Sequence, residues 1–147
     1  MILTPHLLLG AAIAAKISNP FLILPLAFLS HYFLDLLPHK EYSVENIFKK
    51  NWKKSLPDFI KVGVDFSSGI VLISIFSSSE LIVYAGALLA ILPDGLTFLG
   101  FVFSNKFLEH NDDFHKKIHL FVNKKIPAFG GIISQIAVVL IAIFFLL

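Results

Sequence analysis

The sequence His31-Tyr32-Phe33-Leu34-Asp35-Leu36-Leu37-Pro38-His39 closes a long apolar run of the chain. Its ionisable residues His31, Asp35 and His39 recur every four residues, so a helix would place them along one face. Ionisable side chains inside hydrocarbon are costly unless they meet a partner, such as a metal ion, a proton path or a substrate. This stretch therefore predicts a helix of a membrane protein that carries a polar site near one membrane surface.

The composition is typical of a membrane protein. The chain has 147 residues, of which 56% are hydrophobic and 15% are charged, and its mean hydropathy is +0.82. Soluble proteins average about 25% charged residues, and a soluble domain of this length could not bury so much apolar surface. Cysteine is absent, which excludes disulfides and thiolate metal ligands. The first apolar segment lacks a basic start and a cleavage site, so we expect it to be retained as a span.

We predict an all-α polytopic integral membrane protein, a single membrane domain over residues 1–147 with about five transmembrane helices and two cytoplasmic interfacial segments. Proline and turn residues separate the apolar runs from one another. The first two runs are shorter than the ~20 residues usual for a full crossing. The spans are expected at about residues 4–17, 21–37, 58–76, 81–103 and 126–147.

The polar segment 40–56 carries apolar residues at helical spacing, which predicts a helix lying in the membrane interface. We expect membrane lipids as partners and no nucleic acid. The lysines of this segment would face anionic lipid head groups. They are Lys49, Lys50, Lys53 and Lys54.

The distribution of lysine predicts the orientation of the chain. Eleven of the twelve lysines follow the second and fourth spans or lie at the start of the third, and only Lys16 lies at the opposite end. By the positive-inside rule, the lysine-rich side is cytoplasmic. We therefore expect a prokaryotic cytoplasmic membrane protein whose N-terminus and polar site are inside and whose C-terminus is outside.

An internal repeat is one interpretation of the spacing of the polar residues. His6 and Asp35 are separated by 28 residues, and so are Asp65 and Asp94. The hairpin of residues 1–39 would then be duplicated as residues 58–104, with a fifth helix appended. Chance similarity between apolar segments is the alternative.

The predicted topology brings histidines and aspartates from several segments to one membrane face. Imidazole and carboxylate are ligands of Zn, Mn and Fe, so we expect a site for one or two divalent ions, with Zn as the first choice. The three aspartates Asp35, Asp65 and Asp94 are also candidate catalytic groups, one of them as a general base. The candidate metal ligands are His6, His31, Asp35, His39, Asp65, Asp94, His115 and His119.

Several of these residues also have a structural explanation. His6 and His39 would be ordinary interfacial or solvated residues near the ends of spans. The pair His115 and His119 would be the polar face of a helix. Asp65 lies inside apolar sequence, where Lys61 one turn away would be its simplest partner.

Four short motifs occur together in this chain: Thr4-Pro5-His6, Ser30-His31-x3-Asp35, Pro93-Asp94 and His115-x3-His119. Together they resemble the YdjM-like family of membrane-bound metal-dependent hydrolases. The resemblance implies a multi-span helical protein, hydrolase activity and metal binding by the histidines and aspartates of the four motifs. The chain departs from the family around His115, where the Arg-Gly and the Ser of the family motif are missing. It also lacks the Asp-His that follows Pro-Asp in the family.

Together, the residue pattern and the resemblance predict a metal-dependent hydrolase that acts on a phosphoester or acyl bond of a lipid or lipid-linked substrate. The head group of such a substrate would reach the cytoplasmic interface while its tails stay in the bilayer. A metal-ion or proton-coupled transporter is an alternative, but it would need polar residues that reach both faces. A non-catalytic membrane subunit or a haem-binding bundle is another, and the aspartates beside the histidines argue against haem.

Overall fold

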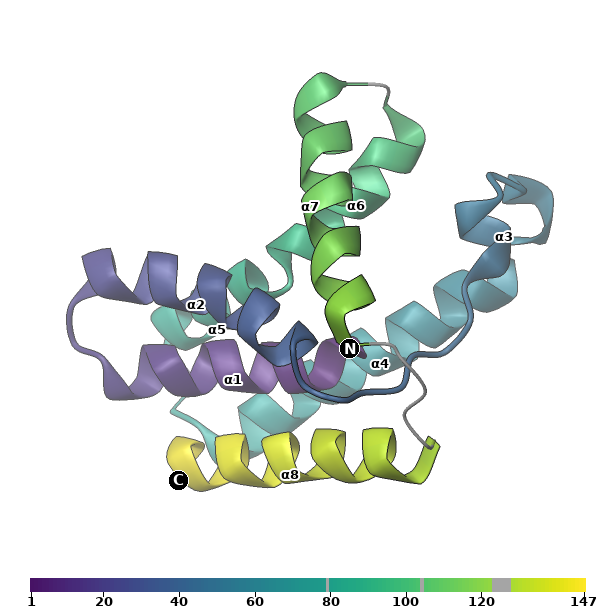
Figure 1. Cartoon of the computed structure of the whole chain (residues 1–147). Helices are drawn as coiled ribbons and strands as arrows, with labels where there is room; N and C mark the ends of the chain where they lie inside the picture. Colours follow the sequence, from purple (N-terminus) through teal and green to yellow (C-terminus); the bar gives the residue numbers. More distant parts are fainter. Residues whose placement is uncertain (79, 104, 123–127) are drawn as a thin grey trace.

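The computed structural model describes residues 1–78, 80–103, 105–122 and 128–147, with the backbone alone for residues 119–122 and 128. Helices and their connections make up this part of the chain, which contains no strand (Figure 1). The predicted all-α fold is therefore confirmed. The helices are α1 (Leu3–Lys16), α2 (Pro20–Asp35), α3 (Glu45–Phe48), α4 (Leu56–Phe76), α5 (Leu81–Ala90), α6 (Leu92–Val102), α7 (Lys106–Val122) and α8 (Ala128–Leu146), with a 3₁₀ turn at Trp52–Lys54.

Proline and capping residues define where the helices begin. Pro20 is the first residue of α2, and the side chain of Asn19 accepts a hydrogen bond from the backbone N–H of Phe21 at 3.0 Å. Pro93 lies in the first turn of α6, where the missing N–H of proline is tolerated. The run expected at 81–103 is therefore two helices, α5 and α6, bent by 54° around Ile91.

Helix α1 lies at the centre of a bundle and contacts α2, α4, α5 and α8 (Figure 1). Two glycines allow α1 and α5 to approach closely, because a Cβ atom built on Gly10 would collide with the carbonyl oxygen of Gly86. The hairpin of α6 and α7 projects from this bundle in Figure 1. The buried core is formed by Leu7, Leu8, Ala11, Ala12, Ile73, Val83, Ala87, Ala142 and Leu146.

Fewer helices than predicted are long enough to cross a membrane. In the described part of the chain, two helices are long and apolar enough to cross a membrane. They cover Leu56–Phe76 and Phe129–Leu146. The bent pair α5 and α6 would be a third span. Helices α1 and α2 are apolar, but they have only 14 and 16 residues. The structure thus supports a membrane protein with two to three helices of spanning length, and the prediction of five such spans is too high.

The segment 40–56 is not the single continuous helix that the sequence predicts. The segment holds two short pieces, α3 and the turn Trp52–Lys54. Lys50 separates them with a φ of 53°, a left-handed conformation that ends a right-handed helix. The other polar segment, 105–125, forms α7 over Lys106–Val122, and residues 123–125 lie outside the described part.

Candidate metal centre

Of the seven predicted ligands whose side chains the structure describes, five come together at one end of the bundle. They form two groups of three that share His31: one with His6 and Asp94, the other with Asp35 and His115. Within each group the ligand atoms lie within 4.8 Å of one another. These five residues, contributed by α1, α2, α6 and α7, are called the His/Asp cluster below. The His/Asp groups in this cluster are positioned to hold a metal ion.

The shortest distances in the cluster centre on Asp35. Its Oδ2 atom lies 3.1 Å from Nε2 of His31 and 2.9 Å from Nε2 of His115, and these two nitrogens are 3.2 Å apart. Oδ1 of Asp94 is 3.6 Å from the first nitrogen and 3.7 Å from the second. Asp35 and His31 are completely buried, whereas the side chain of Asp94 is 31% exposed. One carboxylate is therefore enclosed and the other reaches the outside.

Partners behind the two rings orient them toward the cluster. Nδ1 of His31 lies 2.8 Å from the carbonyl oxygen of Ala90, the last residue of α5. A carbonyl oxygen only accepts, so Nδ1 donates and, in the neutral ring, Nε2 keeps its lone pair for the cluster. Nδ1 of His115 lies 3.2 Å from Oγ1 of Thr97. Such outer contacts are characteristic of histidines that bind metals.

His6 is a buried polar side chain that lacks hydrogen bonds. Its ring is completely buried, and neither Nδ1 nor Nε2 makes a hydrogen bond in the structure. The ring stacks on that of His31, with centroids 4.2 Å apart, and its Nε2 atom is 3.4 Å from Oδ1 of Asp35. Burying a polar group without a hydrogen bond is costly. A cation among these nitrogen and oxygen atoms would relieve that cost, so the donor set fits a metal ion.

Two further residues of the site were missed in the sequence analysis. Asn111 donates from Nδ2 to Oγ1 of Thr97 and to the carbonyl oxygen of Pro93, both at 3.4 Å, and accepts from the hydroxyl of Tyr32 at 3.3 Å. Thr97 and Asn111 thus support His115 from behind. Their spacing was a usable signal, because Thr97 follows Asp94 by three residues and Asn111 precedes His115 by four.

His39 lies beside the cluster and belongs to neither group. Its Nδ1 atom is 2.7 Å from the carbonyl oxygen of Leu37, and its Nε2 atom is 3.1 Å from Oε1 of Glu41. The same Oε1 atom lies 2.9 Å from the ammonium group of Met1, which also contacts Oδ1 of Asp35 at 2.7 Å. His39 is therefore connected to Asp35 through Glu41 and Met1.

Asp65 lies outside both groups and caps the start of α1. Its carboxylate accepts hydrogen bonds from the backbone N–H groups of Leu3 at 2.6 Å and Thr4 at 3.0 Å. It also accepts from Oγ1 of Thr4 at 2.6 Å and from the hydroxyl of Tyr42 at 3.1 Å. A carboxylate at a helix N-terminus satisfies free N–H groups and favours the helix dipole. Burial and the negative charge of Asp65 raise the pKa of Tyr42 above its usual range.

One predicted contact differs in the structure, and a second involves a side chain outside the described residues. Lys61, the expected partner of Asp65, instead donates to Oδ1 of Asp58 at 3.3 Å and to the carbonyl oxygen of Ser43 at 2.8 Å. His119 follows His115 on α7, but its side chain lies outside the described residues. The pairing of the two histidines on one ion therefore stays a prediction.

Comparison of the chain with protein-family models, with curated proteins and with solved structures found no match. The fold and the site alone therefore define the class of protein. In the residues that the structure describes, the chain is all-helical and has two to three helices long and apolar enough to cross a membrane. It carries, at one end of its bundle, His and Asp side chains positioned to hold a metal ion.

Proposed function

We propose that this protein is a membrane-embedded, metal-dependent hydrolase. The observation that carries the proposal is that three imidazoles and two carboxylates from four helices form two groups of three ligands that share the buried His31. The motifs that resemble the YdjM-like family include all five residues of the cluster, which supports the same proposal. Imidazole with carboxylate suits Zn, and Mn or Fe as second choices.

The cluster favours one ion over two. Both groups of three ligands need Nε2 of His31, because its Nδ1 atom is bonded to the carbonyl oxygen of Ala90. One ring nitrogen has one lone pair and therefore binds one ion. We propose that the fully buried group of His31, Asp35 and His115 holds this ion, with the ring of His6 stacked on that of His31 beside it.

Asp94 is the strongest candidate for the general base. Its side chain is 31% exposed, so water and substrate can reach it, and Oδ1 lies within 4 Å of both Nε2 atoms at the centre of the cluster. Asp35 is enclosed and Asp65 is engaged by α1, so neither is placed to accept a proton from incoming water. A bound divalent cation would supply Lewis acidity toward a phosphoryl or acyl oxygen and would acidify water.

The position of the cluster supports a lipid or lipid-linked substrate. It lies at one end of an apolar bundle, so a phosphoester or ester bond just below a head group would reach it. Exposed lysines of the segment 45–54 would attract anionic head groups, and by the positive-inside rule we place this side in the cytoplasm. They are Lys49, Lys50, Lys53 and Lys54.

Hydrolysis by the purified protein tests this proposal. The untagged protein, loaded with zinc in detergent, would be given bis-p-nitrophenyl phosphate, p-nitrophenyl esters and phosphatidylglycerol. We expect release of product from at least one class, loss of that activity in Asp94→Asn with zinc retained, and normal activity in Asp113→Asn. Zinc flux in proteoliposomes without hydrolysis would instead support the transporter.

A further inference from the structure

The two groups of ligands in the His/Asp cluster differ in their access to the outside. His31 belongs to both, and the inner group adds Asp35 and His115 to it. The side chains of these three ligands are at most 7% exposed. The outer group adds His6, which is completely buried, and Asp94, whose side chain is 31% exposed. Of the five cluster residues, Asp94 alone therefore reaches the outside.

The open approach to the cluster is at Asp94. Gly95, the next residue of α6, is exposed, and a Cβ atom built on it would meet nothing within 4 Å. At Asp35, the other carboxylate of the cluster, the ammonium group of Met1 contacts Oδ1 at 2.7 Å and would repel a cation. A cation that enters beside Asp94 meets a negative charge and open space instead.

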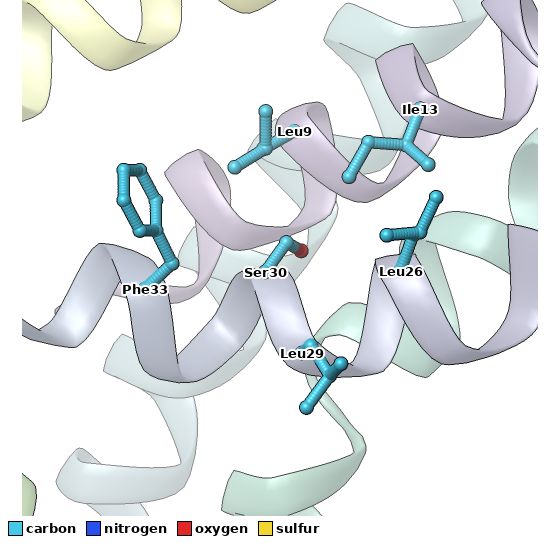
Figure 2. Close-up of a pocket in the computed structure, with 6 residues that line it drawn as sticks. All are labelled: Leu9, Ile13, Leu26, Leu29, Ser30 and Phe33. Carbon is cyan, nitrogen blue, oxygen red and sulfur yellow. The ribbon is translucent and has the colours of Figure 1, made fainter.

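The apolar groove between α1 and α2 is a poor path for a cation (Figure 2). Its volume is about 380 Å³, and five of its six lining side chains are purely hydrocarbon. The sixth, Ser30, donates its hydroxyl proton to the carbonyl oxygen of Ala27 at 2.6 Å. A hydrated ion that enters hydrocarbon loses its water at a large cost in free energy. The lining side chains, none of which belongs to the cluster, are Leu9, Ile13, Leu26, Leu29, Ser30 and Phe33.

The outer group has ring nitrogens that can bind a cation. Neither nitrogen of His6 makes a hydrogen bond, although the ring is completely buried. Nε2 of His31 lies 3.6 Å from Oδ1 of Asp94, and the same nitrogen lies 3.1 Å from Oδ2 of Asp35 in the inner group. Because one nitrogen lone pair binds one ion, the two groups cannot both be occupied. They are therefore alternative positions for a single ion.

We propose that His6, His31 and Asp94 form a capture site, which takes a divalent cation from the outside and delivers it through His31 to the buried inner group. This inference rests on the metal centre of the proposed function and adds the route by which that centre is filled. Delivery to the inner group frees Asp94 from the cation, which agrees with its proposed role as general base. Because the capture site is occupied only in passage, its residues should change the rates of entry and exit by the same factor and leave the affinity of the inner group unchanged.

Zinc exchange by the untagged protein in detergent tests the capture site. Uptake of Zn²⁺ is followed by quenching with EDTA at set times, and release is followed by transfer to an excess of a chromophoric chelator. Asp94→Asn keeps the shape of the side chain and removes its charge. We expect this variant to hold as much zinc at equilibrium as the wild type, with uptake and release both slowed by about 10-fold or more. Asp113→Asn, which changes an exposed carboxylate on α7, should exchange zinc like the wild type.

His6→Phe tests the same site with a second variant. Phenylalanine keeps a ring stacked on His31 and removes both nitrogens, so a buried polar group without hydrogen bonds is lost. The metal-free variant should therefore melt at or above the temperature of the wild type. We again expect slow exchange with the zinc content retained.

Two results would overturn the capture site. Faster release or a lower zinc content in either variant would show that the substituted residue is a permanent ligand. Exchange at the wild-type rate in either variant would show that ions enter by another path. Both results leave the metal centre and the hydrolase standing, whereas a wild-type protein that binds no zinc would refute the metal centre and the capture site together.

Discussion

His31 and His115 bring their Nε2 atoms within 3.2 Å of each other, although they lie 84 positions apart in the chain. The Nδ1 atom of each ring has its own partner: the carbonyl oxygen of Ala90 for His31 and Oγ1 of Thr97 for His115. Helix α2 and the α6–α7 hairpin are therefore joined through the cluster itself. A cation bound there would link the hairpin to the bundle as well as serve chemistry.

Removal of one ligand should empty the site. We expect the untagged wild-type protein to bind about one zinc ion per chain, because the two groups share the single Nε2 atom of His31. His115→Ala should reduce the zinc content to near zero, as measured by elemental analysis after incubation with zinc and desalting. The matched control is His110→Ala, an exposed histidine on the same helix, which should retain full zinc content. Equal zinc content in the two variants would refute the assignment of His115.

Thr97 should control metal affinity without touching the metal. Thr97→Val keeps the shape of the side chain but removes the oxygen that lies 3.2 Å from Nδ1 of His115. Loss of such an outer contact typically weakens metal binding by about 10–100-fold, which competition with a chelator would measure. Thr97→Ser keeps the hydroxyl and should restore most of the affinity. If the serine variant binds zinc no better than the valine variant, the effect is one of packing.

The sequence predicted the kinds of side chain in the site better than it predicted which individual residues belong to it. His31 and Asp35 were recognisable because ionisable groups four residues apart in apolar sequence require a partner. Asp65 is likewise an aspartate in apolar sequence, yet its carboxylate accepts hydrogen bonds from the free N–H groups at the start of α1. An aspartate surrounded by apolar residues in the sequence indicates that its carboxylate has a partner. The identity of that partner depends on which group the tertiary structure brings next to it.

The same limit applies to the helices. Their apolar runs and prolines predicted most boundaries, because proline and turn residues act locally. The break between α5 and α6 follows from Pro93, but its 54° angle and the hairpin that brings His115 to α2 were not predicted. Periodicity alone carries none of this information.

Asp65 is expected to stabilise the fold without binding metal. Asp65→Ala removes four hydrogen bonds at the start of α1, so we expect the free energy of unfolding to fall by about 1–3 kcal/mol. Thermal unfolding in detergent and zinc analysis of the same preparation would check this. Asp113→Ala, which removes an exposed carboxylate, is the control and should change neither quantity. A variant of Asp65 that melts normally but binds no zinc would show that Asp65 is a ligand after all.

Tyr42 should ionise only at unusually high pH. Burial and the charge of Asp65 raise its pKa in the folded protein above the ~10 of an unfolded chain. The folded state therefore holds this proton more tightly, so the associated stability is complete below about pH 10 and is lost as the pH rises toward the folded pKa. An ultraviolet titration of the wild-type protein should show a late tyrosine that is absent in Tyr42→Phe. Superimposable high-pH ends of the two titrations would contradict the placement of Tyr42 against Asp65.

The contact between α1 and α5 should tolerate no side chain at Gly10. A Cβ atom there would collide with the backbone of Gly86 and with the side chain of Ala90, whose carbonyl oxygen orients His31. Gly10→Ala should therefore lower the melting temperature and also weaken zinc binding. Gly63→Ala is the matched control, because a Cβ atom at Gly63 on α4 meets nothing within 4 Å. That substitution should raise stability by about 0.5–1 kcal/mol through helix propensity. A melting temperature of Gly10→Ala that rises in the same way would show that α1 and α5 do not pack through Gly10.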